Sequence, residues 1–117
     1  MKTATEKRIA FRNNLKSGKI MIAPGVGDAL GAKIAEMAGI PCLAMGGYSV
    51  SASRLGQPDV GFLSCTEMAE QLTGICNAVD IPVVADGDTG YGNALNIIRT
   101  ERMFEQAGAA CIFFEDQ

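Results

Sequence analysis

Histidine and tryptophan are missing from this chain of 117 residues, and aromatic residues make up only 6% of it. Without histidine, any proton transfer by the chain has to use a carboxylate, tyrosine, lysine or cysteine side chain. A metal site made from these residues would be rich in oxygen, which favours Mg²⁺ or Mn²⁺ over zinc. The missing histidine therefore narrows both the acid–base and the metal chemistry open to the protein.

Long apolar runs are also missing. None approaches the roughly 18 residues that a membrane span needs, and a net charge of −3 gives no general attraction to nucleic acid. Apolar residues nevertheless make up 48% of the chain and charged residues 20%, as in a globular protein with one modest core. We therefore expect a cytoplasmic protein with neither membrane nor nucleic-acid partners.

The four cysteines lack the CxxC spacing typical of zinc and redox sites. They are Cys42, Cys65, Cys76 and Cys111. We interpret them as free thiols, buried or partly buried, in a reducing compartment. Among the first 19 residues six are basic and only Glu6 is acidic, which indicates a solvated first helix. A targeting presequence is the alternative, but no small-residue cleavage pattern accompanies the basic residues.

Short apolar runs alternate with helical patterns along the chain. Strands are predicted at 19–24, 41–47, 81–86 and 110–116, and their near-continuous apolar character is typical of strands covered on both faces. Helices are predicted before and between them, the first over 4–17 and the second around the apolar stripe Leu30, Ile34 and Met37. The third is predicted over 68–79, with Ser64 or Thr66 as its cap. The fourth follows an Asn93 cap and carries the stripe Ile97, Phe104 and Ala107. This alternation predicts an α/β fold with a parallel sheet.

The connection over residues 48–63 is the longest in the chain and is rich in serine and glycine. Long loops are often functional. Gly46 and Gly47 precede it directly after a predicted strand, where bare backbone N–H groups could hold a carboxylate or phosphoryl group. A Gly-Gly pair is also a common turn signal, and Asp59 in this loop could equally be a turn residue after Pro58.

Acidic residues follow two of the predicted strands. Asp86 and Asp88 close the third strand, and Glu115 closes the fourth. The carboxyl ends of parallel strands form the ligand face of α/β folds, so the three acids would meet if these strands are neighbours. Carboxylates held close together repel one another, and Mg²⁺ would offset that repulsion.

The acidic pair has a simpler explanation, and two other acidic motifs fit it poorly. Asp86 and Asp88 could merely end a strand, with Gly87 and Gly90 shaping a turn. An EF-hand loop does not fit, because Gly90 and Tyr91 stand where it needs an oxygen ligand and a glycine. The threonine of aspartate-nucleophile phosphatases would be one residue out of place at Thr89, and no phosphate-binding P-loop is present.

Three motifs together resemble the isocitrate lyase/phosphoenolpyruvate mutase superfamily, and in particular its 2-methylisocitrate lyases, dimethylmalate lyases and oxaloacetate decarboxylases. The motifs are MGGYSVSASRLGQPDVG at 45–61, ADGDTGYGN at 85–93 and FFEDQ at 113–117. The resemblance implies a (β/α)₈ TIM barrel with an N-terminal helix, of which residues 1–117 would form the N-terminal half, roughly strands 1–4. It also implies a Mg²⁺-dependent (Mn²⁺ is the alternative) carbon–carbon lyase acting on small 2-hydroxy or 2-oxo dicarboxylates through a pyruvate enolate, and a homo-oligomer.

The resemblance assigns a role to each matching residue. Asp86 corresponds to the acid nearest the metal and also to a substrate contact, and Asp88 and Glu115 to acids that hold metal-bound waters. Gly46, Gly47 and Tyr48 correspond to the segment that binds the substrate's acid group, largely through backbone N–H groups. Asp59 corresponds to a catalytic or gating acid in the loop after the second strand.

The chain also departs from the family pattern. Relatives often carry serine or threonine at the position of Gly46 and alanine at that of Gly87, and some have histidine at that of Phe113. The family's acid–base cysteine would follow Gln117, so none of the four cysteines corresponds to it. We therefore expect the 117-residue chain alone to be inactive, as a fragment of a longer enzyme, one of two associating copies or a degraded gene product.

Two further interpretations remain. The first is a catalytically incompetent half-barrel that binds metal or acid, or acts only by assembly. The second is a receiver-like α/β domain, which the size allows. Such a domain expects an acidic pair after its first strand, and IMIAPG at 20–25 supplies none.

Overall fold

Four parallel strands form one sheet in the computed structural model, which describes residues 1–116. The strands β1 (Gly25–Val26), β2 (Leu43–Met45), β3 (Val83–Asp86) and β4 (Cys111–Phe113) lie side by side in sequence order. Each pairs in parallel with the next, and Asp86 lies opposite Phe113 in the β3–β4 register. The predicted parallel α/β architecture is therefore confirmed. Gln117, the end of the FFEDQ motif, lies outside the described residues.

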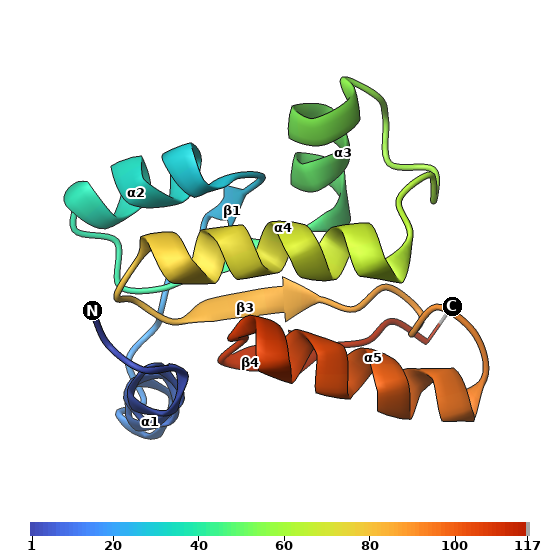
Figure 1. Ribbon diagram of the computed structural model, residues 1–117. Helices are drawn as coiled ribbons and strands as arrows, with labels where there is room; N and C mark the ends of the chain where they lie inside the picture. Colours follow the sequence, from blue (N-terminus) through green and yellow to red (C-terminus); the bar gives the residue numbers. More distant parts are fainter. Residues whose placement is uncertain (117) are drawn as a thin grey trace.

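Three helices cover one face of this sheet. Helices α2 (Ala29–Met37), α4 (Cys65–Ala78) and α5 (Ala94–Ala107) lie next to one another in front of the strands in Figure 1. The predicted caps are present: Ser64 accepts a hydrogen bond from the Glu67 N–H, and Asn93 accepts from the N–H groups of the first turn of α5. In the described part of the chain, no helix is both long and apolar enough to cross a membrane.

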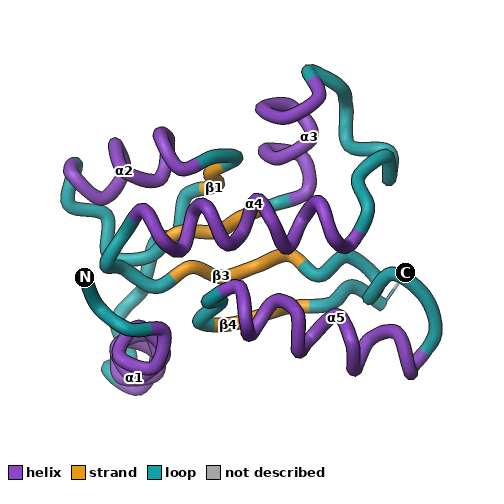
Figure 2. The backbone as a smooth tube through the Cα atoms, viewed as in Figure 1, coloured by secondary structure: helices purple, strands orange, loops and turns teal. Residues whose placement is uncertain are grey.

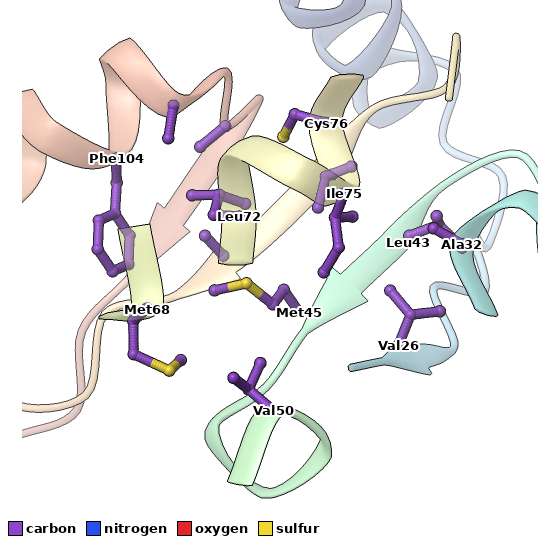
Figure 3. Packing of buried hydrophobic residues seen from close by; sticks show 14 of the residues in the cluster. Val26, Ala32, Leu43, Met45, Val50, Met68, Leu72, Ile75, Cys76 and Phe104 are labelled. Carbon is purple, nitrogen blue, oxygen red and sulfur yellow. The ribbon is translucent and has the colours of Figure 1, made fainter. Parts of the chain in front are cut away.

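The hydrophobic core lies between the sheet and these helices, as Figure 3 shows. Leu43 and Met45 of β2 and Val83 and Ala85 of β3 point into it and are almost fully buried. The alternating residues Ala44, Val84 and Asp86 are only half-buried. The strands were predicted to be covered on both faces, but within residues 1–116 helices cover only one. Asp86 lies on the other face, because side chains alternate along a strand.

Helix α1 (Ala4–Lys16) crosses the end of the sheet opposite to the carboxyl ends of the strands (Figure 2). The Lys7 side chain, which is 5% exposed, donates hydrogen bonds to the carbonyl oxygens of Cys76 (2.7 Å) and Val79 (2.5 Å) at the end of α4. Arg8 donates to the carbonyl oxygens of Glu105 and Ala109 at the end of α5. Lys7 and Arg8 of α1 therefore cap the C-termini of α4 and α5, where positive charge is favourable.

The predicted first strand at 19–24 is wrong. This segment has no strand, and pairing with β2 begins only at the Pro24 carbonyl, which accepts a hydrogen bond from the Ala44 N–H. Among residues 1–116 no other strand pairs along its outer side, and its Ile20 and Ile22 are 96% and 70% exposed. The apolar composition of 19–24 therefore suggested a strand. The described sheet has no strand with which residues 19–23 form hydrogen bonds, because β1 is its edge.

The long connection predicted over 48–63 is also wrong in its first half. Helix α3 (Gly47–Leu55) occupies it, ends at Gly56 in the left-handed conformation and carries Arg54 in its last turn. Its many serines have low helix propensity and hid it from the hydrophobic pattern. The Gly56 cap and the Arg54 position were the signals that could have revealed it.

The helix predicted around Leu30, Ile34 and Met37 is present as α2, but its apolar stripe is not in the core. These three side chains are 71%, 59% and 80% exposed, whereas Ala32 is fully buried. Helix α2 instead contacts α4, and its small residues Ala32 and Ala35 pack in or against the core. The periodicity therefore predicted the helix correctly but the wrong buried face.

Candidate functional site

A cavity of about 240 Å³ opens at the carboxyl ends of the strands. Its lining comes from the end of β3, the loop after it, the segment after β4, the start of α3, the loop between α3 and α4, and the first turn of α4. The lining residues are Gly47, Asp59, Val60, Gly61, Leu63, Met68, Asp86, Asp88, Tyr91 and Glu115. Five of the seven site residues predicted from the sequence thus line one cavity, although they are up to 68 positions apart in the chain: Gly47, Asp59, Asp86, Asp88 and Glu115.

Asp86 occupies the centre of the hydrogen-bond network at this cavity. One carboxylate oxygen, Oδ1, accepts a hydrogen bond from the Asp88 N–H (2.8 Å), and the other, Oδ2, accepts from the Gly47 N–H (3.2 Å). These contacts connect the end of β3 with the beginning of α3. They fix the orientation of the carboxylate and leave further lone pairs on both oxygens for a ligand.

Asp88 lies beyond the end of β3, and hydrogen bonds of the loop fix its position. Its φ of +51° lies in the left-handed region, which is uncommon for a residue other than glycine. The Asp88 side chain accepts a hydrogen bond from the Thr89 N–H, and its carbonyl accepts from the Glu115 N–H (2.8 Å). The second contact ties the loop after β3 to the residues after β4, so Asp88 and Glu115 line the same cavity.

Asp59 reaches the cavity from the loop after α3 and lies against Gly47. A Cβ atom at Gly47 would stand 2.6 Å from an Asp59 carboxylate oxygen, so only glycine leaves room for this side chain as placed. Asp59 itself is exposed. Glycine at residue 47 therefore has a local reason. It lets the Asp59 carboxylate lie beside the Gly47 backbone, whose N–H donates a hydrogen bond to Asp86.

Gly46 and Tyr48 do not line the cavity. Gly46 is the N-cap of α3 and has no side chain to cap it, and Tyr48 is 69% exposed. The sequence predicted that backbone N–H groups of this segment could bind an anionic group. Helix α3 begins here, and the first N–H groups of a helix have no hydrogen-bond partner within it. One of these groups, the Gly47 N–H, is already taken by Asp86.

The negative charge of the cavity is uncompensated by its own lining. Four lining side chains are carboxylates, and no lining residue in the described chain is lysine or arginine. Asp59, Asp86 and Asp88 form no ion pair within residues 1–116. Since like charges at close range repel, a bound cation would be favourable here.

The donor set fits a hard divalent cation such as Mg²⁺. Its charged ligands are carboxylate oxygens, and no cysteine or histidine is among the lining residues of the described chain. Within residues 1–116, however, no three acidic, cysteine or histidine side chains are gathered closely enough to hold an ion by themselves. This agrees with the behaviour of Mg²⁺, which keeps several waters and uses one or two protein carboxylates.

Tyr91 is the polar lining residue that the sequence interpretation did not assign to the site. It is half-buried, has a φ of +59°, and packs its ring against Phe104 with 6.5 Å between the ring centroids. Burial raises the pKa of Tyr91 above its ordinary value, and the negative charges of Asp88, Asp86 and Asp59 raise it further. Its place in the GDTGYGN motif was the signal that could have drawn attention to it.

The four cysteines are free thiols, as predicted, and none lines the cavity. Burial raises the pKa of both Cys42 and Cys76 to about 11, so neither is a ready nucleophile at neutral pH.

Gly87 stands at the position where relatives often carry alanine, and the structure leaves little room for a side chain there. A Cβ atom there would stand 2.6 Å from the Phe114 ring.

Comparisons with known proteins give a consistent result. The family model described as phosphoenolpyruvate phosphomutase matches residues 11–117. The 2,3-dimethylmalate lyase of Eubacterium barkeri is 49% identical over 107 residues, which cover 92% of this chain and 37% of that protein.

Solved structures agree with the sequence comparison. A crystal structure of 2,3-dimethylmalate lyase, described as a PEP mutase/isocitrate lyase superfamily member, has a TM-score of 0.86 at 38% identity and covers all of this chain and 41% of that one. A phosphonopyruvate hydrolase in complex with oxalate and Mg²⁺ has a TM-score of 0.91 at 39% identity, over 95% of this chain and 39% of that one. The chain thus spans about two-fifths of the length of these relatives.

Proposed function

Because the chain belongs to the phosphoenolpyruvate mutase/isocitrate lyase superfamily, we propose that it carries the metal-binding part of a Mg²⁺-dependent carbon–carbon lyase for small 2-hydroxy or 2-oxo dicarboxylates. Its four parallel strands and their helices are part of a (β/α)₈ barrel. The observation that carries the proposal is that one cavity is lined by four carboxylates, those of Asp59, Asp86, Asp88 and Glu115, while no lysine or arginine is among its described lining residues.

In this proposal Asp86 holds the metal directly, and Asp88 and Glu115 hold waters around it. Support comes from the two backbone hydrogen bonds that orient the Asp86 carboxylate before any ligand arrives. When bound, Mg²⁺ supplies positive charge that stabilises the oxyanion developing as the carbon–carbon bond breaks. Mn²⁺ would satisfy the same oxygen ligands.

The start of α3 is proposed to bind the acid group of the substrate. The N–H groups of Gly47, Tyr48 and the next residue point out of the first helical turn, and the helix dipole favours an anion there. Since Asp86 uses the Gly47 N–H in this structure, the N–H of Tyr48 and its neighbour are the donors left for the substrate. Gly46, with open space around its Cα, allows a ligand to approach the backbone.

Asp59 is the proposed catalytic carboxylate of this half of the site. It lies on the loop that follows α3, is exposed, and meets the cavity beside Gly47. From this place its carboxylate can accept a proton or a hydrogen bond from a substrate hydroxyl held at the start of α3.

Magnesium binding by the purified chain tests the metal part of the proposal. Isothermal titration calorimetry should show Mg²⁺ binding that weakens by at least about tenfold in Asp86→Ala, because one unit charge a few ångströms away is worth several kcal/mol at an effective dielectric constant near 20. Glu101→Gln, which removes one charge from α5 outside the cavity, should bind as the wild type does. Equal binding by wild type and Asp86→Ala would overturn the assignment.

Activity has its own test, since the chain spans only 37% of the similar dimethylmalate lyase. Release of pyruvate from 2,3-dimethylmalate, 2-methylisocitrate and oxaloacetate with added Mg²⁺ would identify the substrate. A second candidate is a metal- and acid-binding half-barrel without turnover, with another copy as its partner. Magnesium binding without pyruvate release, together with a dimeric mass in light scattering, would favour that candidate.

A further inference from the structure

Tyr91 differs in kind from every other polar side chain that lines the acid cavity. The other polar lining side chains in the described chain are the carboxylates of Asp59, Asp86, Asp88 and Glu115. Ionised carboxylates only accept hydrogen bonds, whereas a tyrosine keeps its proton at neutral pH and can donate one. Among the described lining residues, the Tyr91 hydroxyl is therefore the one side-chain donor available to an anionic ligand.

The backbone around Tyr91 is held in an unfavourable conformation by several contacts. Its φ of +59° is in the left-handed region, between Gly90 and Gly92, which also have positive φ. The buried Thr100 hydroxyl donates to the Gly90 carbonyl (3.0 Å), and the Gly90 N–H donates to the Gly87 carbonyl (2.9 Å). Backbone strain of this kind persists where the surroundings fix it, and it gathers at ligand sites.

Packing explains the ring of Tyr91 but not its hydroxyl. The ring lies tilted against Phe104, which is fully buried, and joins the edge of the hydrophobic core. A phenylalanine would make the same contact. The hydroxyl takes no part in this ring contact, and the carboxylates of Asp88, Asp86 and Asp59 are near enough to act on it electrostatically.

We propose that Tyr91 is a ligand-binding residue whose hydroxyl donates a hydrogen bond to a carboxylate oxygen of the anion bound in the acid cavity. This inference rests on the proposed function, because it needs an anion to enter a cavity lined by acids. The divalent cation would offset the charge of the acids, and the Tyr91 hydroxyl would orient the ligand. Tyr91 then contributes to the selection of the ligand and not to the binding of the metal.

Tyr91→Phe separates the hydroxyl from the ring, and oxalate is the probe, as a small planar dianion. At saturating Mg²⁺, calorimetry should show that oxalate binds the variant about tenfold or more weakly than the wild type, as expected for loss of a hydrogen bond to a charged group. Affinity for Mg²⁺ alone should stay within about twofold, and the urea midpoint should stay unchanged. Thr73→Val removes a hydroxyl from the exposed face of α4 and should leave oxalate binding unaltered.

The possible results separate this inference from the proposed function. If Tyr91→Phe binds oxalate as tightly as the wild type, Tyr91 is a packing residue and the inference is wrong, while the metal site stands. If the wild type binds Mg²⁺ but no oxalate, the inference is again wrong, and the metal assignment survives. If the wild type binds neither, both fail together. A loss of oxalate affinity with an equal loss of Mg²⁺ affinity or stability would also count against a specific hydrogen bond.

Discussion

Replacing Gly27 by alanine tests whether the loop after β1 holds helix α3 in place beside the acid cavity. A Cβ atom at Gly27 would stand 2.2 Å from the Ser49 carbonyl oxygen and 2.8 Å from both the Ser49 carbonyl carbon and the Ser53 hydroxyl oxygen. The Gly27 carbonyl also accepts hydrogen bonds from Ser53 (3.0 Å) and Gln71 (2.7 Å). The loop, α3 and α4 therefore meet at one glycine.

The cost of the substitution follows from which atoms collide. The nearest contacts belong to the backbone of α3, which cannot turn aside as a side chain can, so the helix has to move by about 1 Å. Overpacking of this kind costs about 1–3 kcal/mol, and we expect the upper part of that range. Ser49 is two residues from Gly47, whose N–H donates to Asp86, so the same shift should weaken the orientation of the Asp86 carboxylate.

Urea unfolding followed by circular dichroism measures the first effect, and Mg²⁺ titration measures the second. Gly27→Ala should lose about 2–3 kcal/mol of unfolding free energy and bind Mg²⁺ more weakly. Gly74→Ala is the matched control, because Gly74 is exposed within α4 and has open space around it. It should gain about 0.5–1 kcal/mol through helix propensity.

The reasoning is refuted if Gly27→Ala is as stable as the wild type to within about 0.5 kcal/mol. A second contrary result would be a large loss of stability with Mg²⁺ affinity unchanged. In that case the position of α3 would matter for folding but would not reach Asp86.

Three further predictions concern other parts of the molecule. Lys7→Met should lower the free energy of unfolding by about 2 kcal/mol, because two carbonyls at the end of α4 lose a buried donor; Lys16→Met on the exposed side of α1 should have little effect in the same urea experiment. Gly46→Ser should raise stability by a few tenths of a kcal/mol, since Gly46 is an N-cap without a side-chain hydrogen bond and a Cβ there meets nothing within 4 Å; a lower melting temperature would contradict this. Burial raises the pKa of Cys42 and Cys76 from 9.0 to about 11, so above pH 9 the unfolded chain loses protons that the folded chain keeps. The free energy of unfolding should therefore be undiminished by these thiols below pH 9 and fall as the pH rises toward 11, less steeply in Cys76→Ala, as urea melts at several pH values would show.

Local patterns in the sequence were sufficient for most of the elements. The stripe Met68, Leu72, Ile75 and Val79 predicted α4 and its buried face, because 3.6-residue periodicity places these side chains on one side of a helix. Ser64 and Asn93 predicted two helix starts, because their side chains satisfy N–H groups within the next three residues. The motif resemblance led to the family, which the comparisons confirm.

The sequence by itself determined β2, β3 and β4, every helix except α3, the caps Ser64 and Asn93, and the appearance of Asp86, Asp88 and Glu115 at the ends of two strands. Each of these depends on residues close together in the chain. Only the tertiary structure decided that residues 47–55 form a helix, that the apolar stripe of α2 faces outward, and that Gly47 donates to Asp86 while Tyr91 joins the acids at the cavity. These features depend on contacts between residues far apart in the chain, and their free energies come from packing and hydrogen bonds that no local pattern encodes.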